Sequence, residues 1–366
     1  MGIFSRNKND GQLTPQLILD ALRTVQDPDL HKDLVSLGMI QDLKIDGSKV
    51  SFSLVLTTPA CPMKAKMEQE CREAVSAIPG VEEIEIHVTA NTAAHHGRPE
   101  KIRIPGVKNI IAVSSGKGGV GKSTVAVNLA LALKASGASV GLMDADAYGP
   151  NIPQMMGVSE QPTSDGQKIY PPERDGMKII SVGLIAQGDM PVIWRGPMIH
   201  SLIQQFLHDV DWGELDYLVV DMPPGTGDAQ LSLSQLVPLS GAVMVTTPQE
   251  VSLSDVRRAI MMFRKVEVPV LGIVENMAYF LCPDNGKTYE IFGKGAAEKL
   301  ASEYHIASLG RIPIDPRIAA GGDAGDPIVL AEPDSELSQE FRKVAGTVAQ
   351  QISIANKIKQ PLPIIE

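Results

Sequence analysis

Residues 115–124 combine glycines, lysines and hydroxyl groups at a spacing suited to binding phosphate. The glycines allow backbone N–H groups to turn toward phosphate oxygens, and a helix that follows adds positive potential at its N-terminus. Lys122 would reach the β and γ phosphates, and the Ser123 hydroxyl would complete the coordination of Mg²⁺, which binds few protein ligands. The predicted nucleotide-binding residues are Gly116, Gly118, Gly119, Val120, Gly121, Lys122, Ser123 and Thr124.

Three aspartates follow apolar runs whose ends would place carboxylates beside this loop. Asp144 and Asp146 come after residues 140–143, and Asp221 comes after residues 217–220. In P-loop proteins the aspartate at the end of an apolar strand typically supports the coordination of nucleotide-bound Mg²⁺. Because ligands of open α/β sheets bind at the carboxyl ends of the strands, we expect these acids to lie near the phosphates.

The elements that would hold these residues alternate between strands and helices from residue 108 onward. Residues 110–113 predict a buried strand before the glycines, and residues 125–134, free of Gly and Pro, predict a helix after them. The remaining predicted elements are strands at 140–143, 217–220, 242–246 and 270–274 and a closing helix at 334–358. This alternation predicts an α/β fold with a mostly parallel sheet and helices on both faces, and together with the glycine loop it predicts a P-loop NTPase.

A linker divides the chain into two predicted domains. Residues 91–107 lack apolar periodicity and contain Gly97, Pro99 and Pro105, which favours an extended connection. The sequence therefore predicts a small α+β domain at 12–90 and the P-loop domain at 108–358.

The smaller domain begins with a clear helix signal. Thr14 is a good N-cap and Pro15 suits the first helical position. Strand-like runs at 39–45 and 49–56 are joined by Asp46-Gly47, which predicts a hairpin. A helix to about residue 78 and a strand at 81–88 follow.

Two cysteines of this domain have different predicted roles. Cys61 lies at a predicted helix N-terminus, where the helix dipole should lower the thiol pKa and favour the metal-binding thiolate. An inert, half-buried cysteine is the alternative. Cys71 lies in the middle of the helix, where core packing is expected.

Composition excludes several classes of partner. The net charge is −10 and the isoelectric point is about 5.3, so the chain lacks the basic surface that nucleic acid requires. The apolar runs are too short to span a bilayer, and three irregularly spaced cysteines argue for reduced thiols. We expect a soluble, cytoplasmic protein that binds neither nucleic acid nor membrane.

Lys117 adds a second lysine between the first two glycines of the loop. A loop of this form resembles the deviant Walker A of the MinD, ParA and nitrogenase iron protein superfamily. The resemblance implies an ATPase in which two copies form a homodimer and Lys117 reaches the phosphates of the partner.

The same resemblance implies roles for the other site residues. Asp146 would orient the attacking water, acting as a catalytic residue together with Lys117 and Lys122. The Mg²⁺ set would be Ser123, Asp144 and Asp221. The adenine would be held by Asn276 and Pro313.

Further motifs narrow the resemblance. Residues 12–90, with Asp27-Pro28-Asp29-Leu30 and the loop 57–62 around Cys61, resemble the iron–sulfur assembly domain of SufT-like proteins. Residues 194–198 (Trp-Arg-Gly-Pro-Met), Asn276-Met277 and Cys282-Pro283-Asp284 resemble the Mrp/ApbC branch. The resemblance implies a carrier that hydrolyses ATP, binds an iron–sulfur cluster, and serves apo iron–sulfur proteins and assembly scaffolds.

One position departs from that branch, which usually carries Cys-x-x-Cys where this chain has Cys282 and then Asn285. Two thiolates from two copies do not complete a four-iron site. One hypothesis is that the missing ligands come from Cys61, from Asp284 or from an external thiol. The alternative is that the protein binds a cluster weakly, or not through Cys282 but through Cys61. The alternatives for function are a MinD/ParA-like positioning ATPase and a regulatory switch that carries no cluster.

Overall fold

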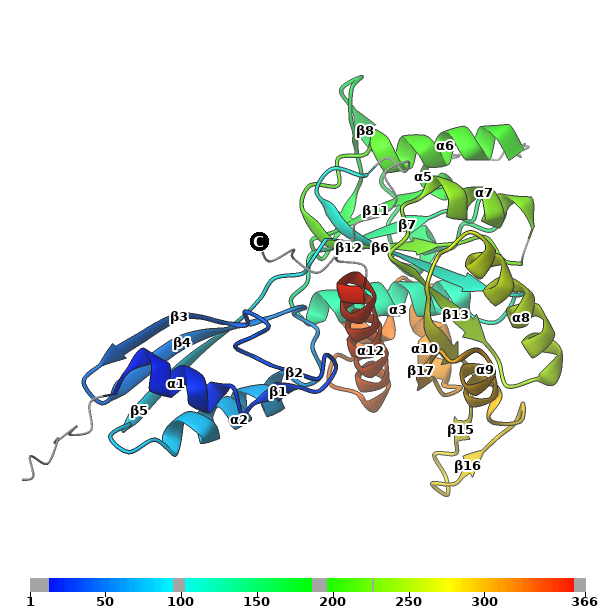
Figure 1. Ribbon diagram of the computed structural model, residues 1–366. Helices are drawn as coiled ribbons and strands as arrows, with labels where there is room; N and C mark the ends of the chain where they lie inside the picture. The colour runs from blue at the N-terminus through cyan, green and yellow to red at the C-terminus, as the bar shows by residue number, and fades with distance from the viewer. Residues whose placement is uncertain (1–12, 95–102, 186–195, 226, 359–366) are drawn as a thin grey trace, which may run out of the picture. The chain divides into compact units, whose positions relative to one another are not determined.

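A computed structural model describes residues 13–94, 103–185, 196–225 and 227–358 (Figure 1). Trp194 and Arg195, which belong to the motif at residues 194–198, lie outside the described residues. The chain forms two compact units, Met1–Thr92 and Ala93–Glu366, and the break falls inside the segment predicted as a linker. Within the described ranges, no helix has the length and apolar content needed to cross a membrane.

The N-terminal unit is a three-stranded sheet covered by two helices. Strand order is β3-β4-β5, with β3 antiparallel and β5 parallel to the central β4. Its elements are α1 (Pro15–Leu22), β1 (Gln26–Asp27), β2 (Lys32–Asp33), β3 (Ile40–Asp46), β4 (Lys49–Leu56), α2 (Lys64–Ser76) and β5 (Glu83–Ala90).

Local sequence signals explain most of this unit. Thr14 caps α1 by accepting a hydrogen bond from Leu17 N at 3.3 Å, as predicted. Alternate residues of β4 are buried, which is the pattern of a strand with one face on a core. The predicted turn is shifted by one residue, because Asp46 pairs with Lys49 and leaves residues 47–48 as the loop.

The larger unit is built on an eight-stranded sheet in the order β10-β11-β7-β12-β6-β13-β14-β17. All neighbours are parallel except β10 and β11, which confirms the predicted mostly parallel sheet. Its strands are β6 (Val107–Ser115), β7 (Val140–Asp144), β10 (Glu173–Arg174), β11 (Met177–Ser181), β12 (Leu215–Asp221), β13 (Gly241–Thr246), β14 (Val270–Glu275) and β17 (Ala307–Arg311). Two small hairpins add β8 (Thr163–Ser164) with β9 (Ile169–Tyr170) and β15 (Phe280–Leu281) with β16 (Thr288–Tyr289).

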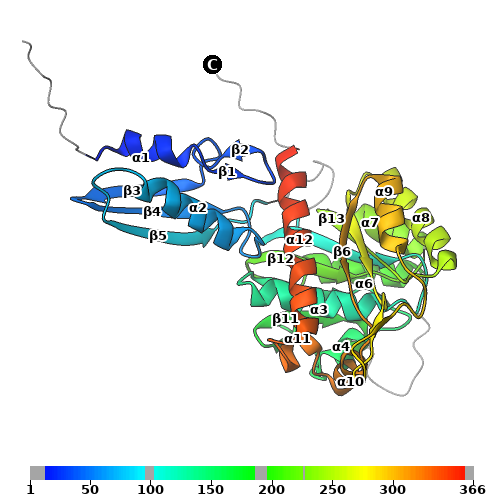
Figure 2. The ribbon, with the colours of Figure 1, turned by 90° about the horizontal axis from the view of Figure 1, so that it is seen from below.

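Helices cover both faces of this sheet, as the alternating pattern predicts. On one face α3 packs against β6, β7 and β12, and α12 lies beside α3 (Figures 1 and 2). On the other face α6, α8 and α9 contribute to a core with the central strands. The helices are α3 (Lys122–Ala135), α4 (Ile152–Met155), α5 (Val182–Ile185), α6 (Gly196–His208), α7 (Asp228–Leu236), α8 (Glu250–Lys265), α9 (Ala296–Tyr304), α10 (Pro316–Ala324), α11 (Ile328–Ala331) and α12 (Glu336–Ile358).

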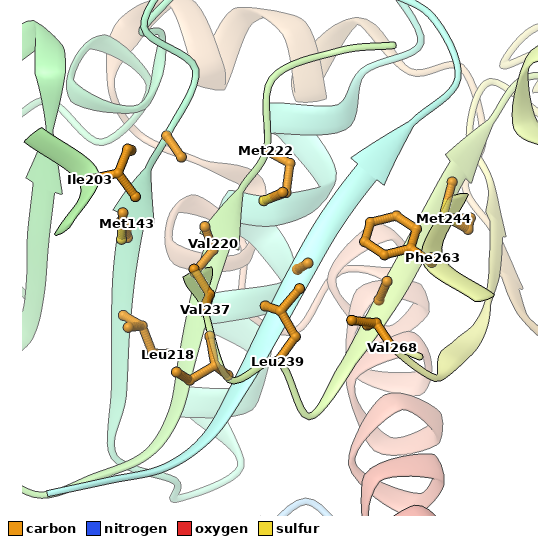
Figure 3. Packing of buried hydrophobic residues seen from close by; sticks show 14 of the residues in the cluster. Met143, Ile203, Leu218, Val220, Met222, Val237, Leu239, Met244, Phe263 and Val268 are labelled. Carbon is orange, nitrogen blue, oxygen red and sulfur yellow. The ribbon is translucent and has the colours of Figure 1, made fainter. Parts of the chain in front are cut away.

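The core fixes where the strands end. Figure 3 shows Leu218 and Val220 of β12 among side chains from neighbouring elements, including Phe263 of α8. Strand register then pairs Asp221 with Asp144 across β12 and β7, next to the end of β6. The acids that are distant in sequence therefore meet at one edge of the sheet.

Candidate functional site

The predicted phosphate loop connects the end of β6 to the start of α3. Gly119 and Gly121 have left-handed φ angles of 76° and 81°, and Ser115 Oγ donates to Lys117 O at 2.9 Å. The loop borders a cavity of about 470 Å³. Its lining residues are Ser115, Lys117, Gly118, Gly119, Gly121, Lys122, Ser123, Thr124, Asp146, Asn151, Gln154, Met155, Pro224, Ile318, Ala319, Gly322 and Asp323.

A buried charge cluster lies at the base of this cavity. Lys122 Nζ donates to Asp221 Oδ1 at 2.7 Å, and Ser123 Oγ donates to Asp221 Oδ2 at 2.5 Å. Burial raises the pKa of Asp221, while the Lys122 ammonium and the two hydrogen bonds act to lower it. A hydroxyl next to a carboxylate is the donor set that Mg²⁺ uses in P-loop sites, so Ser123 and Asp221 fit the predicted metal position.

Asp146 also faces the cavity. Its Oδ2 lies 3.5 Å from Lys122 Nζ, while its buried Oδ1 has no hydrogen-bond partner among the described residues. A buried carboxylate oxygen without a partner is costly, so its retention calls for a function. This oxygen is a candidate acceptor for the attacking water.

Asp144 has a different environment, although it stands beside Asp221. Its Oδ1 accepts from Asp146 N at 3.0 Å, and its Oδ2 accepts from Ser181 Oγ at 2.9 Å and from Ile152 N at 3.3 Å. Burial, and then the charge of Asp221, raise the pKa of Asp144 to about 8. Asp144 is absent from the cavity lining and holds the Asp146 loop and the start of α4, while its predicted place in the metal shell stays a prediction.

The predicted adenine residues also stand back from the cavity lining. Asn276 is buried and donates from Nδ2 to Val120 O at 2.9 Å, which braces the phosphate loop from behind. Pro313 is buried as well. Their role in holding adenine stays a prediction.

The cavity wall opposite the phosphate loop was not predicted from the sequence. This wall is formed by α4 and α10, through Gln154 and Met155 on one side and Ile318, Ala319 and Gly322 on the other. Asp315, which caps α10 by accepting from Arg317 N at 2.9 Å, and Pro316 after it are a readable helix start. Nothing in the spacing places that helix against the phosphate loop.

The contact between Gly121 and Asn276 leads to a stability prediction. A Cβ on Gly121 would lie 2.1 Å from Asn276 Nδ2, at a left-handed φ that side chains disfavour. We expect Gly121→Ala to displace Asn276 from Val120 and to lower the free energy of unfolding by about 2 kcal/mol. Gly118→Ala is the matched control, since its Cβ would meet no atom within 4 Å. Equal unfolding free energies for the two variants, measured by urea denaturation, would contradict the prediction.

Cys282 lies at the tip of the β15–β16 hairpin. Its N–H donates to Lys287 O at 3.0 Å, and Gly286 N donates to its carbonyl at 2.9 Å. Asn285, where a second cysteine was expected, accepts from Lys287 N at 2.9 Å and donates to Tyr289 Oη at 3.2 Å. Asn285 is thus a turn residue. The described part of the chain contains no group of three or more acidic, histidine or cysteine side chains that would hold a metal ion.

The base of this hairpin is bonded to the segment that leads into α10. Ile312 N donates to Glu275 O at 2.9 Å, and Ile314 N donates to Tyr279 O at 2.6 Å. Phe280 forms a parallel bridge with Ile314. The chain therefore enters the cysteine hairpin directly from residues that also flank the nucleotide site.

The environment of Cys61 contradicts the prediction that its thiol pKa is lowered. The helix begins at Lys64, after the N-cap Met63, and Cys61 is half-buried just before it. Burial raises the pKa of the Cys61 thiol and outweighs the hydrogen bonds from the N–H groups of Met63 and Lys64, while the charges of Asp29 and Asp27 raise it further. The predicted lowering was wrong because burial, which the sequence does not display, exceeds the effect of the helix terminus.

Cysteine reactivity is expected to follow these environments. Cys71 is buried in the core, as predicted, and burial raises its pKa to about 12. In the folded protein we expect iodoacetamide to label Cys282 and Cys61 and to leave Cys71 unmodified, with labelling of Cys61 rising with pH as its thiolate forms. Mass spectrometry measures the labelling, and protein unfolded in guanidinium is the control in which all three cysteines react. Labelling of Cys71 in the folded protein would contradict this order.

Comparison with known proteins adds to this geometry. A family model described as the NUBPL iron-transfer P-loop NTPase matches residues 106–349. The chain belongs to this family. A second model, described as an iron–sulfur cluster assembly protein, matches residues 15–88 of this P-loop NTPase.

Relatives match nearly the full length of this P-loop NTPase. An iron–sulfur cluster carrier protein of Synechocystis is 51% identical over 349 residues, covering 94% of this chain and 99% of the relative. One of Escherichia coli is 44% identical, covering 92% of each chain. A solved nucleotide-binding protein of Archaeoglobus fulgidus, in complex with ADP, is 40% identical with a TM-score of 0.58 over 65% of this chain and 94% of that one. The fold predicted from the sequence is therefore confirmed.

Proposed function

We propose that this protein hydrolyses ATP and carries an iron–sulfur cluster, which it passes to apo-proteins. The observation that carries the proposal is that one chain contains both a candidate phosphate site and, beside it, a hairpin with a cysteine. The candidate phosphate site is defined by the bonds among Lys122, Ser123 and Asp221, and the β15–β16 hairpin contains Cys282. The full-length relatives named as iron–sulfur cluster carriers support the cargo.

Hydrolysis would use the residues around the loop in distinct roles. Lys122 would bind the β and γ phosphates, and Ser123 and Asp221 would hold Mg²⁺, which supplies charge neutralisation when bound. Asp146 would accept a hydrogen bond from water through its unpartnered Oδ1 and orient that water toward the γ phosphorus. Water attacks, the bond from the γ phosphorus to the bridging oxygen breaks, and ADP and inorganic phosphate form.

The proposal includes a homodimer in the cytoplasm. Lys117 lines the cavity at the start of the loop, and in the proposed dimer its ammonium would reach the phosphates of the second copy. ATP would close the dimer and hydrolysis would loosen it. The partners would be apo iron–sulfur proteins and assembly scaffolds, with no role for nucleic acid or membrane.

The cluster would be held by Cys282 of both copies, with further ligands from Cys61, Asp284 or a small external thiol. Asn285 offers no thiolate and is engaged in the turn. Because one copy presents a single thiol at the hairpin, a four-iron cluster needs ligands from beyond it. A regulatory ATPase without a cluster is the second candidate, and the same Asn285 favours it.

The test is reconstitution with iron and sulfide under anaerobic conditions. We expect the wild-type protein to hold iron with a visible charge-transfer spectrum and to transfer it to an apo-acceptor. Cys282→Ser should abolish cluster binding, and Cys61→Ser should lower it if Cys61 is a ligand. Cys71→Ala is the matched control, because Cys71 is buried in the core and has no predicted role in cluster binding.

Each outcome distinguishes the alternatives. Loss of iron in Cys61→Ser with no change in Cys282→Ser would eliminate the hairpin as the cluster site. Absence of any cluster in the wild type, with ATP hydrolysis intact, would favour the switch ATPase. Binding to liposomes or DNA would favour a MinD-like or ParA-like function.

A further inference from the structure

The wall opposite the phosphate loop is made of two helices from distant parts of the sequence. α4 and α10 contact each other and lie side by side in Figure 2. Gln154 and Met155 line the cavity from the last turn of α4, and Gly322 and Asp323 line it from the last turn of α10. The position of these two helix ends therefore sets the width of the cavity.

The C-terminal ends of the two helices cross at a pair of glycines. Gly157 follows α4 and Gly325 caps α10, with φ angles of 59° and 72°. A Cβ on Gly325 would lie 2.6 Å from Gly157 Cα, and a Cβ on Gly157 would lie 2.9 Å from Gly325 O. The two backbones approach so closely that there is no room for a side chain between them.

Arg174 of β10 spans this crossing. Its Nη1 donates to Met156 O at 2.5 Å and also to Gly325 O, and its Nη2 lies 3.5 Å from Asp326 Oδ1. Met156 and Gly325 are the C-cap residues of α4 and α10. Carbonyl groups at helix ends lack intrahelical partners and carry partial negative charge, so one guanidinium satisfies both ends at once.

The opposite ends of the two helices have separate anchors. Asp144 accepts from Ile152 N at the start of α4, and Asp315 caps the start of α10. The bonds and ion pairs that Arg174 forms within the described residues include neither Lys122 nor Asp146. Loss of Arg174 would therefore loosen the far wall without moving the charge cluster that acts on the γ phosphate.

We propose that Arg174 is a positioning residue for nucleotide binding. It ties the C-terminal ends of α4 and α10 together and so holds the wall against which ATP is enclosed. The inference rests on the proposed function only in taking this cavity as the ATP site. The planar guanidinium is needed because it directs several N–H groups to separate acceptors, which an ammonium on a shorter side chain does not reproduce.

The test compares Arg174→Gln and Arg174→Lys with the wild type in the full chain. We expect the Kd for ATP, measured by calorimetry, to rise about tenfold in Arg174→Gln and by less in Arg174→Lys. The kcat at saturating ATP should stay within about threefold of the wild type, because the catalytic groups keep their contacts. Arg257→Gln is the matched control: it removes an arginine that bonds Glu303 between α8 and α9, and it should keep the wild-type Kd.

Hydrogen exchange provides a second measurement on the same variants. In Arg174→Gln the amides of Gly157 and Asp326 should exchange faster, while the amide of Asn276 behind the loop should not change. Unchanged Kd and unchanged exchange would overturn the role of Arg174, as would a loss of kcat with normal Kd. Failure of the wild type to bind ATP would instead overturn the assignment of the cavity, and with it the proposed function.

Discussion

Lys122→Ala is expected to lower the rate of ATP hydrolysis by at least about a hundredfold. The ammonium of Lys122 is buried between two carboxylates, 2.7 Å from Asp221 and 3.5 Å from Asp146, and it faces the cavity. Its removal takes away the cation that would bind the phosphates. Phosphate release measures the rate, and Lys134→Ala, at the other end of α3, is the matched control.

The same variant should change the dependence of stability on pH. Burial already raises the pKa of Asp221, and without Lys122 the hydrogen bond from Ser123 is left to oppose that effect. The neutral acid is then the favoured folded form, so stability is present at low pH and is lost as the pH rises and the carboxyl ionises. We expect the destabilisation relative to the wild type to grow as the pH rises above the ordinary pKa of an aspartate, about 4, toward about 3 kcal/mol.

The variant Lys122→Arg distinguishes the effect of the positive charge on stability from the effect of the lysine on the rate of hydrolysis. It keeps a cation beside Asp221 and should recover much of the stability, while the larger guanidinium does not restore hydrolysis. If Lys122→Ala were as stable as the wild type at high pH, the buried pair would not contribute as described.

Asp146→Asn should have the second large effect, on the chemical step alone. Asp146 lines the cavity and its buried Oδ1 has no partner among the described residues, and an amide is a poor acceptor for the proton of an attacking water. We expect kcat to fall about a hundredfold while the Kd for ATP stays within about threefold. Single-turnover phosphate release and equilibrium binding of ATP give the two quantities.

Asp209→Asn, on the exposed residue after α6, is the control for loss of a carboxylate and should hydrolyse ATP at the wild-type rate. A large rise in Kd in Asp146→Asn would show that Asp146 acts in binding, and the assignment to water would then be wrong.

The parts of the site that are local in sequence were predictable. The glycine loop, Lys122 and Ser123 form one short stretch, and Asp221 ends an apolar strand, so spacing and periodicity identify them. Asp144 illustrates the limit, since its three donors come from Asp146, Ile152 and Ser181 and only tertiary packing brings the last of these to it.

Properties that depend on burial or on distant contacts were not predictable. The pKa of Cys61 depends on how much of the thiol the core covers, and the far wall of the cavity depends on α4 meeting α10. Arg174 lies on a two-residue strand with no motif around it. Two of its partners are the backbone carbonyls of Met156 and Gly325, which any residue type would supply.

The Cys282 hairpin arises from backbone that is shared with the nucleotide site. Asn276, in the chain that leads into the hairpin, is bonded to Val120, and Tyr279 at the base of the hairpin is bonded to Ile314 before α10. Thermodynamic linkage makes any coupling through this segment reciprocal. The factor by which ATP changes the affinity of the hairpin for iron is also the factor by which iron changes the affinity for ATP. Loading with iron would then be measurable as a change in the dissociation constant of ATP.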